Sequence, residues 1–140
     1  RSPRRNSLTL GVIVNRLPRK ASVDKIIQRA KISWGLGDWE ITWEYADLSH
    51  EGESDPRYWT EKRAHIILDK ETARNADKKK LMRLVAHELG HAVVYPIWRC
   101  MSDFVETYLK SGKEREVYEN AVNSAENIVI DWMIVNVLGL

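Results

Sequence analysis

The sequence predicts an α+β domain in which a small, mostly antiparallel sheet packs on helices. Two segments in the second half of the chain, residues 75–95 and 113–138, repeat their apolar residues with the period of a helix. Two short segments, residues 39–45 and 64–69, have the composition of strands. An amphipathic segment at residues 22–34 precedes them and is expected to cover one face of the sheet.

The first half of the chain contains the predicted sheet. Residues 39–45 alternate aromatic or aliphatic side chains with polar ones, which is the period of a half-buried strand. Residues 64–69 form a second, short apolar strand. Residues 47–61, between the two strands, are polar and contain glycine and proline, so we expect an exposed connection. In the preceding helix, Ser22 is a favourable N-cap residue and Gly35 favours a stop.

The most informative motif is His-Glu-Leu-Gly-His at residues 87–91, inside the predicted helix at residues 75–95. Residues four apart lie on the same face of a helix, so His87 and His91 can reach one metal ion. Glu88 then points to the side, where it can hold a metal-activated water and take its proton. The structural alternative is a pair of ordinary histidines on an amphipathic helix.

Two histidines need a third protein ligand, because a catalytic zinc site uses three and leaves one position open. The chain has four histidines, His50, His65, His87 and His91. None follows the motif, so the third ligand is expected to be a carboxylate from the helix at residues 113–138.

At 100° per residue, Glu126 lies at the margin of the apolar stripe of that helix, whereas Asp131 falls on its polar face. A partly desolvated carboxylate needs a partner such as a metal ion, which favours Glu126. Glu119, two turns earlier on nearly the same side, is the alternative ligand, and Glu126 could instead pair with a lysine at the rim. The predicted stripe comprises Val117, Ala121, Val122, Ala125, Ile128, Val129, Trp132 and Met133.

With these features the chain resembles the gluzincins, zinc peptidases in which a glutamate on a second helix follows the HExxH helix. It is most similar to small single-domain versions from phage and prophage genomes and to the metallopeptidase domain of ImmA/IrrE-type regulators. The resemblance implies a minimal zincin fold, one zinc ion held by His87, His91 and Glu126, and Glu88 as the general base. It also implies that the strand before the motif helix, residues 65–69, forms the cleft edge, where it can pair with an extended peptide. The alternative is an edge strand covered by its own loop.

The sequence departs from the thermolysin-like pattern in two ways. The interval from His91 to Glu126 is long. Ile130, rather than an aspartate, lies four residues after Glu126. Tyr95, Tyr108 and Tyr118 are candidates for an additional donor to the transition state, and Tyr118 is closest in sequence to the ligand helix. The alternative for each is a tyrosine at the rim with its hydroxyl in water. Trp59 and Trp98 fall in predicted loops and are candidates to line a cleft, whereas Trp132 and three other tryptophans are expected in the core.

Composition limits the remaining possibilities. With 140 residues and 44% hydrophobic content, residues 9–140 are expected to form one domain, preceded by a mobile basic tail at residues 1–8. The single Cys100 cannot form an internal disulfide. No segment resembles a signal peptide or a membrane span, so a cytoplasmic location is expected.

A net charge of +2 gives no strong indication of nucleic-acid binding, and the basic run at residues 78–80 is interpreted as a solvated face. The expected partner is a peptide or protein substrate. The sequence therefore predicts a zinc-dependent peptidase. The alternative is a non-catalytic zincin-fold binding or structural component, for example of a phage particle or a repressor-control complex.

Overall fold

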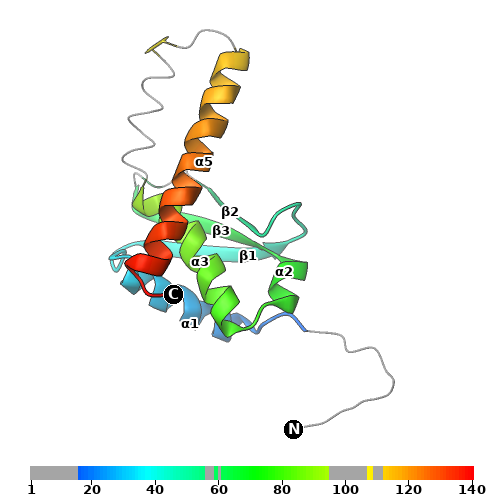
Figure 1. Ribbon diagram of the computed structural model, residues 1–140. Helices are drawn as coiled ribbons and strands as arrows, with labels where there is room; N and C mark the ends of the chain where they lie inside the picture. Colours follow the sequence, from blue (N-terminus) through cyan, green and yellow to red (C-terminus); the bar gives the residue numbers. More distant parts are fainter. Residues whose placement is uncertain (1–15, 56–58, 60, 95–106, 109–111) are drawn as a thin grey trace.

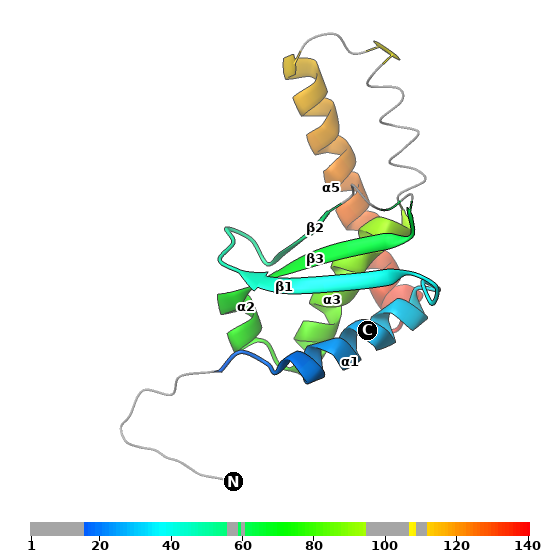
Figure 2. The ribbon, with the colours of Figure 1, turned by 180° about the vertical axis from the view of Figure 1, so that it is seen from behind.

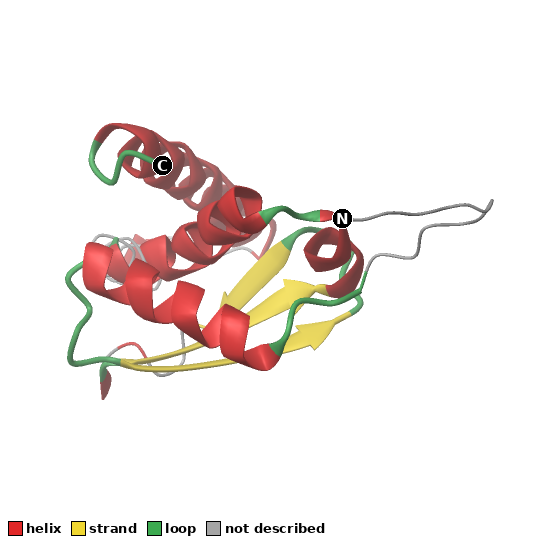
Figure 3. Cartoon of the chain, turned by 90° about the horizontal axis from the view of Figure 1, so that it is seen from below, coloured by secondary structure: helices red, strands yellow, loops and turns green. Residues whose placement is uncertain are grey.

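The structure is a computed structural model that describes residues 16–55, 59, 61–94, 107–108 and 112–140. The predicted tail at residues 1–8 lies outside the described residues. The elements, in chain order, are α1 (Lys20–Ser33), β1 (Glu40–Ala46), β2 (Gly52–Asp55), β3 (Arg63–Asp69), α2 (Lys70–Asn75), α3 (Lys78–Val93) and α5 (Gly112–Asn136). The predicted α+β class is confirmed. Figures 1 and 2 show α1 and α3 together on one face of the sheet, and Figure 3 shows this layering from below.

The described strands form one mixed sheet with the order β1-β3-β2. β1 and β3 are parallel, with Ile41 opposite Ala64 and Tyr45 opposite Leu68. β2 is antiparallel to β3, with Gly52 opposite Leu68. The prediction of a mostly antiparallel sheet was wrong, because the connection between β1 and β3 is long enough for a crossover, which needs about a dozen residues or more.

The sheet edge was also predicted wrongly. Residues 65–69 belong to β3, which lies between the other two strands and has no free edge. The strand order makes β2 an edge strand of the described sheet. β2 lies within residues 47–61, which we expected to form an exposed connection. β2 is polar, with the sequence Gly-Glu-Ser-Asp, so it lacks the apolar alternation by which a strand is recognised.

The core lies between the sheet and the helices on its covered face. Side chains of β3 alternate, with Ala64, Ile66 and Leu68 buried. This alternation is expected for a sheet with one packed face and one solvated face. Helices α1 and α3 supply the opposite wall of the core: Val23, Ile26, Ile27 and Ala30 from α1, and Leu81, Leu84, Val85, Ala86, Leu89 and Ala92 from α3.

Helix α1 fixes the position of the motif helix. It begins at Lys20, two residues before the predicted N-cap Ser22, and it ends where predicted, before Gly35, whose φ of 74° is readily adopted only by glycine. The indole Nε1 of Trp34 donates a hydrogen bond of 2.8 Å to the carbonyl oxygen of Ala86. This bond ties the end of α1 to α3 immediately before the HExxH motif.

The segment predicted as one helix from residue 75 forms two helices. Asn75 is the last residue of α2, and α3 begins at Lys78. The break is stabilised by Asp77, whose Oδ1 accepts a 2.7 Å hydrogen bond from the backbone N–H of Lys80 as an N-cap. Tyr95, the predicted end, lies outside the described residues; α3 ends at Val93.

Helix α5 is oriented differently from the prediction. Its buried residues are Glu126, Ile130 and Ile134, and its N-terminal half extends beyond the rest of the domain (Figure 1). Much of the apolar stripe predicted to face the core is exposed: Val117, Ile128, Val129 and Trp132. The sequence shows which residues share a face of the helix, but the packing of α3 decides which face turns inward.

Gly90 permits the close packing of α3 on α5. A Cβ atom at Gly90 would lie 2.5 Å from Cγ2 of Ile130, which is fully buried. We expect Gly90→Ala to lower the free energy of unfolding, because overpacking costs about 1–3 kcal/mol and the helix propensity of alanine returns only about 1 kcal/mol. Urea unfolding measures this change.

Gly112→Ala is the matched control, because a Cβ atom there meets nothing within 4 Å. The clash predicts that Ile130→Ala and Gly90→Ala together destabilise the protein less than the sum of the two single changes. An unchanged stability in Gly90→Ala would show that the two helices do not pack as closely as described.

Asp69 joins the end of β3 to two other segments. Its Oδ1 accepts from the backbone N–H of Leu48 at 2.9 Å, and its Oδ2 accepts from the N–H and hydroxyl of Thr72. These hydrogen bonds hold the pKa of Asp69 below its usual value, and the bond from Leu48 has the largest effect. A lowered pKa adds stability at pH values above the unfolded-state pKa, about 3.9, and this stability is lost as the pH falls through the folded-state pKa.

We therefore expect Asp69→Ala to lower the midpoint of thermal unfolding at pH 7 and to lower it progressively less below about pH 4. Thermal unfolding of both proteins across this pH range measures the difference. A constant difference at all pH values would contradict the role of the ionised carboxylate.

No helix in the described residues has the length and apolar character needed to cross a membrane.

Candidate active site

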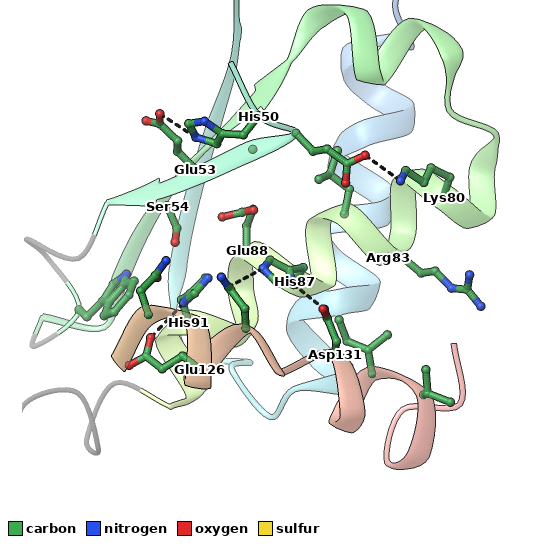
Figure 4. A pocket seen from close by; sticks show the side chains of 18 residues that line it. His50, Glu53, Ser54, Lys80, Arg83, His87, Glu88, His91, Glu126 and Asp131 are labelled. Carbon is green, nitrogen blue, oxygen red and sulfur yellow. Dashed lines mark hydrogen bonds and ion pairs between the residues drawn. The ribbon is translucent and has the colours of Figure 1, made fainter. Parts of the chain in front are cut away.

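A cleft of about 1000 Å³ lies between α3, α5 and β2. All three residues of the motif with polar side chains, His87, Glu88 and His91, line it (Figure 4). Residues of β2 and of the loop before it form the opposite wall, and α5 contributes Glu126 and Asp131. Three elements that are separate in the sequence therefore meet at the motif.

The helical period of α3 separates the motif residues from the core residues. Leu84, Val85 and Leu89 are buried in the core, whereas His87 and His91 lie one turn apart on the neighbouring face. The two imidazole rings are 5.2 Å apart between centroids, with an angle of 81° between their planes. The predicted common face of the two histidines is thus present.

Glu126 lies beside the motif. His91 Nδ1 is 3.2 Å from Glu126 Oε1, and both side chains are largely buried, with 12% and 8% exposed. The second carboxylate oxygen, Oε2, is buried and has no hydrogen-bond partner in the described structure. Glu119, the alternative ligand, is exposed and does not line the cleft in the described residues. The structure therefore brings Glu126, rather than Glu119, to the histidines.

Two residues of α5 that the sequence did not assign to the site hold His87. Its Nδ1 lies 2.7 Å from Asp131 Oδ1, and its Nε2 lies 3.0 Å from Asn127 Oδ1. We had placed Asp131 on the polar face without a role. The available signal was the spacing of Asn127 and Asp131, which puts two polar side chains one turn apart on α5.

The hydrogen bonds of the two histidines differ in what they leave for a cation, because both ring nitrogens of His87 face oxygen atoms whereas only one nitrogen of His91 does. An ionised carboxylate only accepts, so Nδ1 of His87 and Nδ1 of His91 carry the protons in their contacts with Asp131 and Glu126. In neutral His91 the other nitrogen, Nε2, then carries a lone pair. Nε2 of His87 faces the acceptor oxygen of Asn127, so it is open to a cation only when Asn127 moves away. A carboxylate on Nδ1–H is the usual outer support of a metal-binding histidine.

These donors fit a zinc ion in chemical type. Two imidazole nitrogens and the unpartnered Oε2 of Glu126 make a set of two nitrogens and one oxygen, as in known catalytic zinc sites. Within the described residues, however, no three His, Cys, Asp or Glu side chains are grouped closely enough to hold a metal ion. His91 and Glu126 contact each other instead, and His87 Nε2 faces Asn127.

Glu88 is a second buried carboxylate of the cleft, with 6% of its surface exposed. Burial raises the pKa of Glu88, and the charges of His87 and His91 partly oppose this change. A raised pKa makes the carboxylate a stronger base, closer to neutral pH, which suits proton transfer.

Gly52 of β2 lies against the carboxylate of Glu88. Figure 4 shows the Glu88 side chain pointing toward β2. A Cβ atom at Gly52 would lie 3.1 Å from Glu88 Oε2 and 3.2 Å from the carbonyl oxygen of Ile67. The Ile67 oxygen is part of the sheet backbone and cannot easily move, so Glu88 would be displaced. The absence of a side chain at Gly52 therefore allows β2 to approach the carboxylate.

If Glu88 acts as a base, Gly52→Ala should reduce kcat by about tenfold, because small displacements of reacting groups slow catalysis strongly. The free energy of unfolding should change much less. Gly37→Ala is the control, since nothing lies within 4 Å of its added Cβ. Equal kcat values in the two variants would contradict the role assigned to Gly52.

The structure tests the positions of some of the tyrosines expected to act as donors and of the tryptophans expected to line a cleft. Tyr118 and Tyr108 do not line the cleft in the described residues, and Tyr108 is 66% exposed. The expectation that Tyr118 donates to a transition state has no support from its position, because it lies on the projecting half of α5. Trp59 does line the cleft, as one of our interpretations held, whereas Trp98, Tyr95 and Cys100 lie outside the described residues.

The chain matches no protein-family model, no curated protein and no solved structure. The functional argument therefore rests on the residues of this chain.

Proposed function

We propose that this protein is a zinc-dependent peptidase with a minimal zincin fold. The observation that carries the proposal is the meeting of the HExxH residues with a buried carboxylate from α5, whose Oε2 has no partner in the described structure. Glu88 favours a catalytic site over a structural one, because a structural zinc site needs no base and usually closes its fourth position.

Each residue of the site has its own role in the proposed peptide hydrolysis. His87, His91 and Glu126 would hold the metal, while Asp131 fixes the ring orientation of His87. A bound zinc ion supplies Lewis acidity toward the scissile carbonyl and lowers the pKa of water. Glu88 accepts a proton from the attacking water on its carboxylate and passes it to the nitrogen of the leaving amine.

The cleft also suggests how a peptide would be held. Residues 51–54 line it, and β2 has only β3 as a neighbour in the described sheet. A strand with one unpaired edge can bind an extended peptide through main-chain hydrogen bonds. This proposal moves the peptide-binding strand from residues 65–69, as first expected, to β2.

The test is incubation of the zinc-loaded protein with a diverse peptide library, followed by mass spectrometry of the newly formed ends. New ends that are absent with identically prepared Glu88→Gln would support the peptidase. If protein that holds stoichiometric zinc cleaved no peptide, peptide hydrolysis as a general activity would be rejected. The alternative, a non-catalytic zincin-fold binding or structural component, would then be favoured.

A further inference from the structure

A second hollow lies between α1 and the junction of α2 with α3, and it shares no residue with the cleft. Its volume is about 420 Å³. Ser22, Lys25 and Arg29 line it from successive turns of α1, and Lys78 lines it from the start of α3. Two helices that pack on each other therefore contribute three cationic residues and a hydroxyl to one hollow.

The cations of this hollow lack carboxylate partners. Among the described residues, the side chains of Lys25, Arg29 and Lys78 make no ion pair or hydrogen bond. The single carboxylate of the hollow, Asp77, uses Oδ1 to cap α3 at the N–H of Lys80. The hollow thus has a local charge of +2, from three cations and one carboxylate.

Two other lysines on the same helices are paired with carboxylates. Lys20 of α1 lies 2.9 Å from Asp24, and Lys80 of α3 lies 2.8 Å from Glu51. Lys25 and Arg29, by contrast, are four residues apart on one helix, where like charges repel each other. A bound anion would remove this repulsion, so the arrangement is that of an anion site with positive charge from two elements.

The floor of the hollow is apolar. Pro18, Ile26, Ala76 and Leu81 contribute to it, and Ile26 and Leu81 belong to the buried core. A floor of this kind has no hydrogen bonds to offer a bare inorganic ion but gives contact area to a hydrocarbon or aromatic group. We propose that this hollow binds a phosphate monoester attached to an apolar group, with the phosphate between Lys25, Arg29 and Lys78.

Phenyl phosphate is the probe, and isothermal titration calorimetry on the full chain without added metal measures its binding. Phenyl phosphate should bind more tightly than inorganic phosphate, and phenol should not bind. Arg29→Gln and Lys78→Gln should each weaken binding by about tenfold or more, as expected for lost hydrogen bonds to a charged group. Lys79→Gln is the matched control, because Lys79 is a neighbouring exposed lysine that does not line the hollow.

A peptide containing phosphotyrosine distinguishes the two sources of the same chemistry. Tighter binding of this peptide than of phenyl phosphate would indicate a phosphorylated protein side chain, and weaker binding would indicate a small phosphorylated molecule; both results support the site. The proposal is overturned if phenyl phosphate does not bind at millimolar concentration, or if Lys79→Gln weakens binding as much as Arg29→Gln. Neither result depends on the peptidase proposal.

Discussion

Glu88→Gln is expected to reduce kcat for peptide hydrolysis by about 10²- to 10⁴-fold, the usual contribution of a general base. The amide has nearly the shape of the carboxylate but cannot accept the proton of the attacking water. Because Glu88 is buried with a raised pKa, loss of its charge should not destabilise the fold. The measurement is kcat and KM on one peptide identified in the library, with zinc content and the unfolding midpoint determined for the same samples.

Glu44→Gln is a suitable control, because Glu44 is an exposed carboxylate on β1 that does not line the cleft. Its kcat should equal that of the unchanged protein. If Glu88→Gln retained full activity with normal zinc content, Glu88 would not be the base. If it lost activity together with zinc or folded structure, the comparison would identify a structural role.

The second large effect concerns the third ligand. Glu126→Gln is expected to weaken zinc binding by about 100-fold or more, since loss of even an outer partner of a ligand costs about 10- to 100-fold. Glu119→Gln should leave the affinity unchanged, because Glu119 is exposed and lies outside the described cleft lining. Competition with a chromophoric chelator measures both affinities.

These two variants also decide between the alternatives that the sequence left open. Loss of zinc affinity in Glu119→Gln, with normal affinity in Glu126→Gln, would require α5 to present a different turn to α3. That outcome would also conflict with the 3.2 Å contact between His91 and Glu126.

Local periodicity explains what could be predicted from the sequence. The motif helix and the glutamate helix were recognised because their apolar residues recur with a period that depends only on nearby residues. The shared face of His87 and His91 follows from the same period. Glu126 was placed near the motif because a carboxylate at the margin of an apolar stripe needs a partner.

Features that depend on distant residues were not predictable in this way. The parallel pairing of β1 with β3 is decided by the path of the connection, and β2 has no apolar alternation to reveal it. The inward face of α5 depends on Gly90, which admits Ile130 and so turns Ile128 and Trp132 outward. The contact of Asp131 with His87 follows from this same orientation, so it was missed together with it.

The most direct test of the account is anomalous scattering at the zinc edge from crystals of the protein grown with equimolar zinc. The account predicts one strong site within about 2.0–2.2 Å of His87, His91 and Glu126, with Glu88 close by but not a ligand. A zinc ion bound elsewhere, or one bound through Glu88 or Glu119 in place of Glu126, would contradict it.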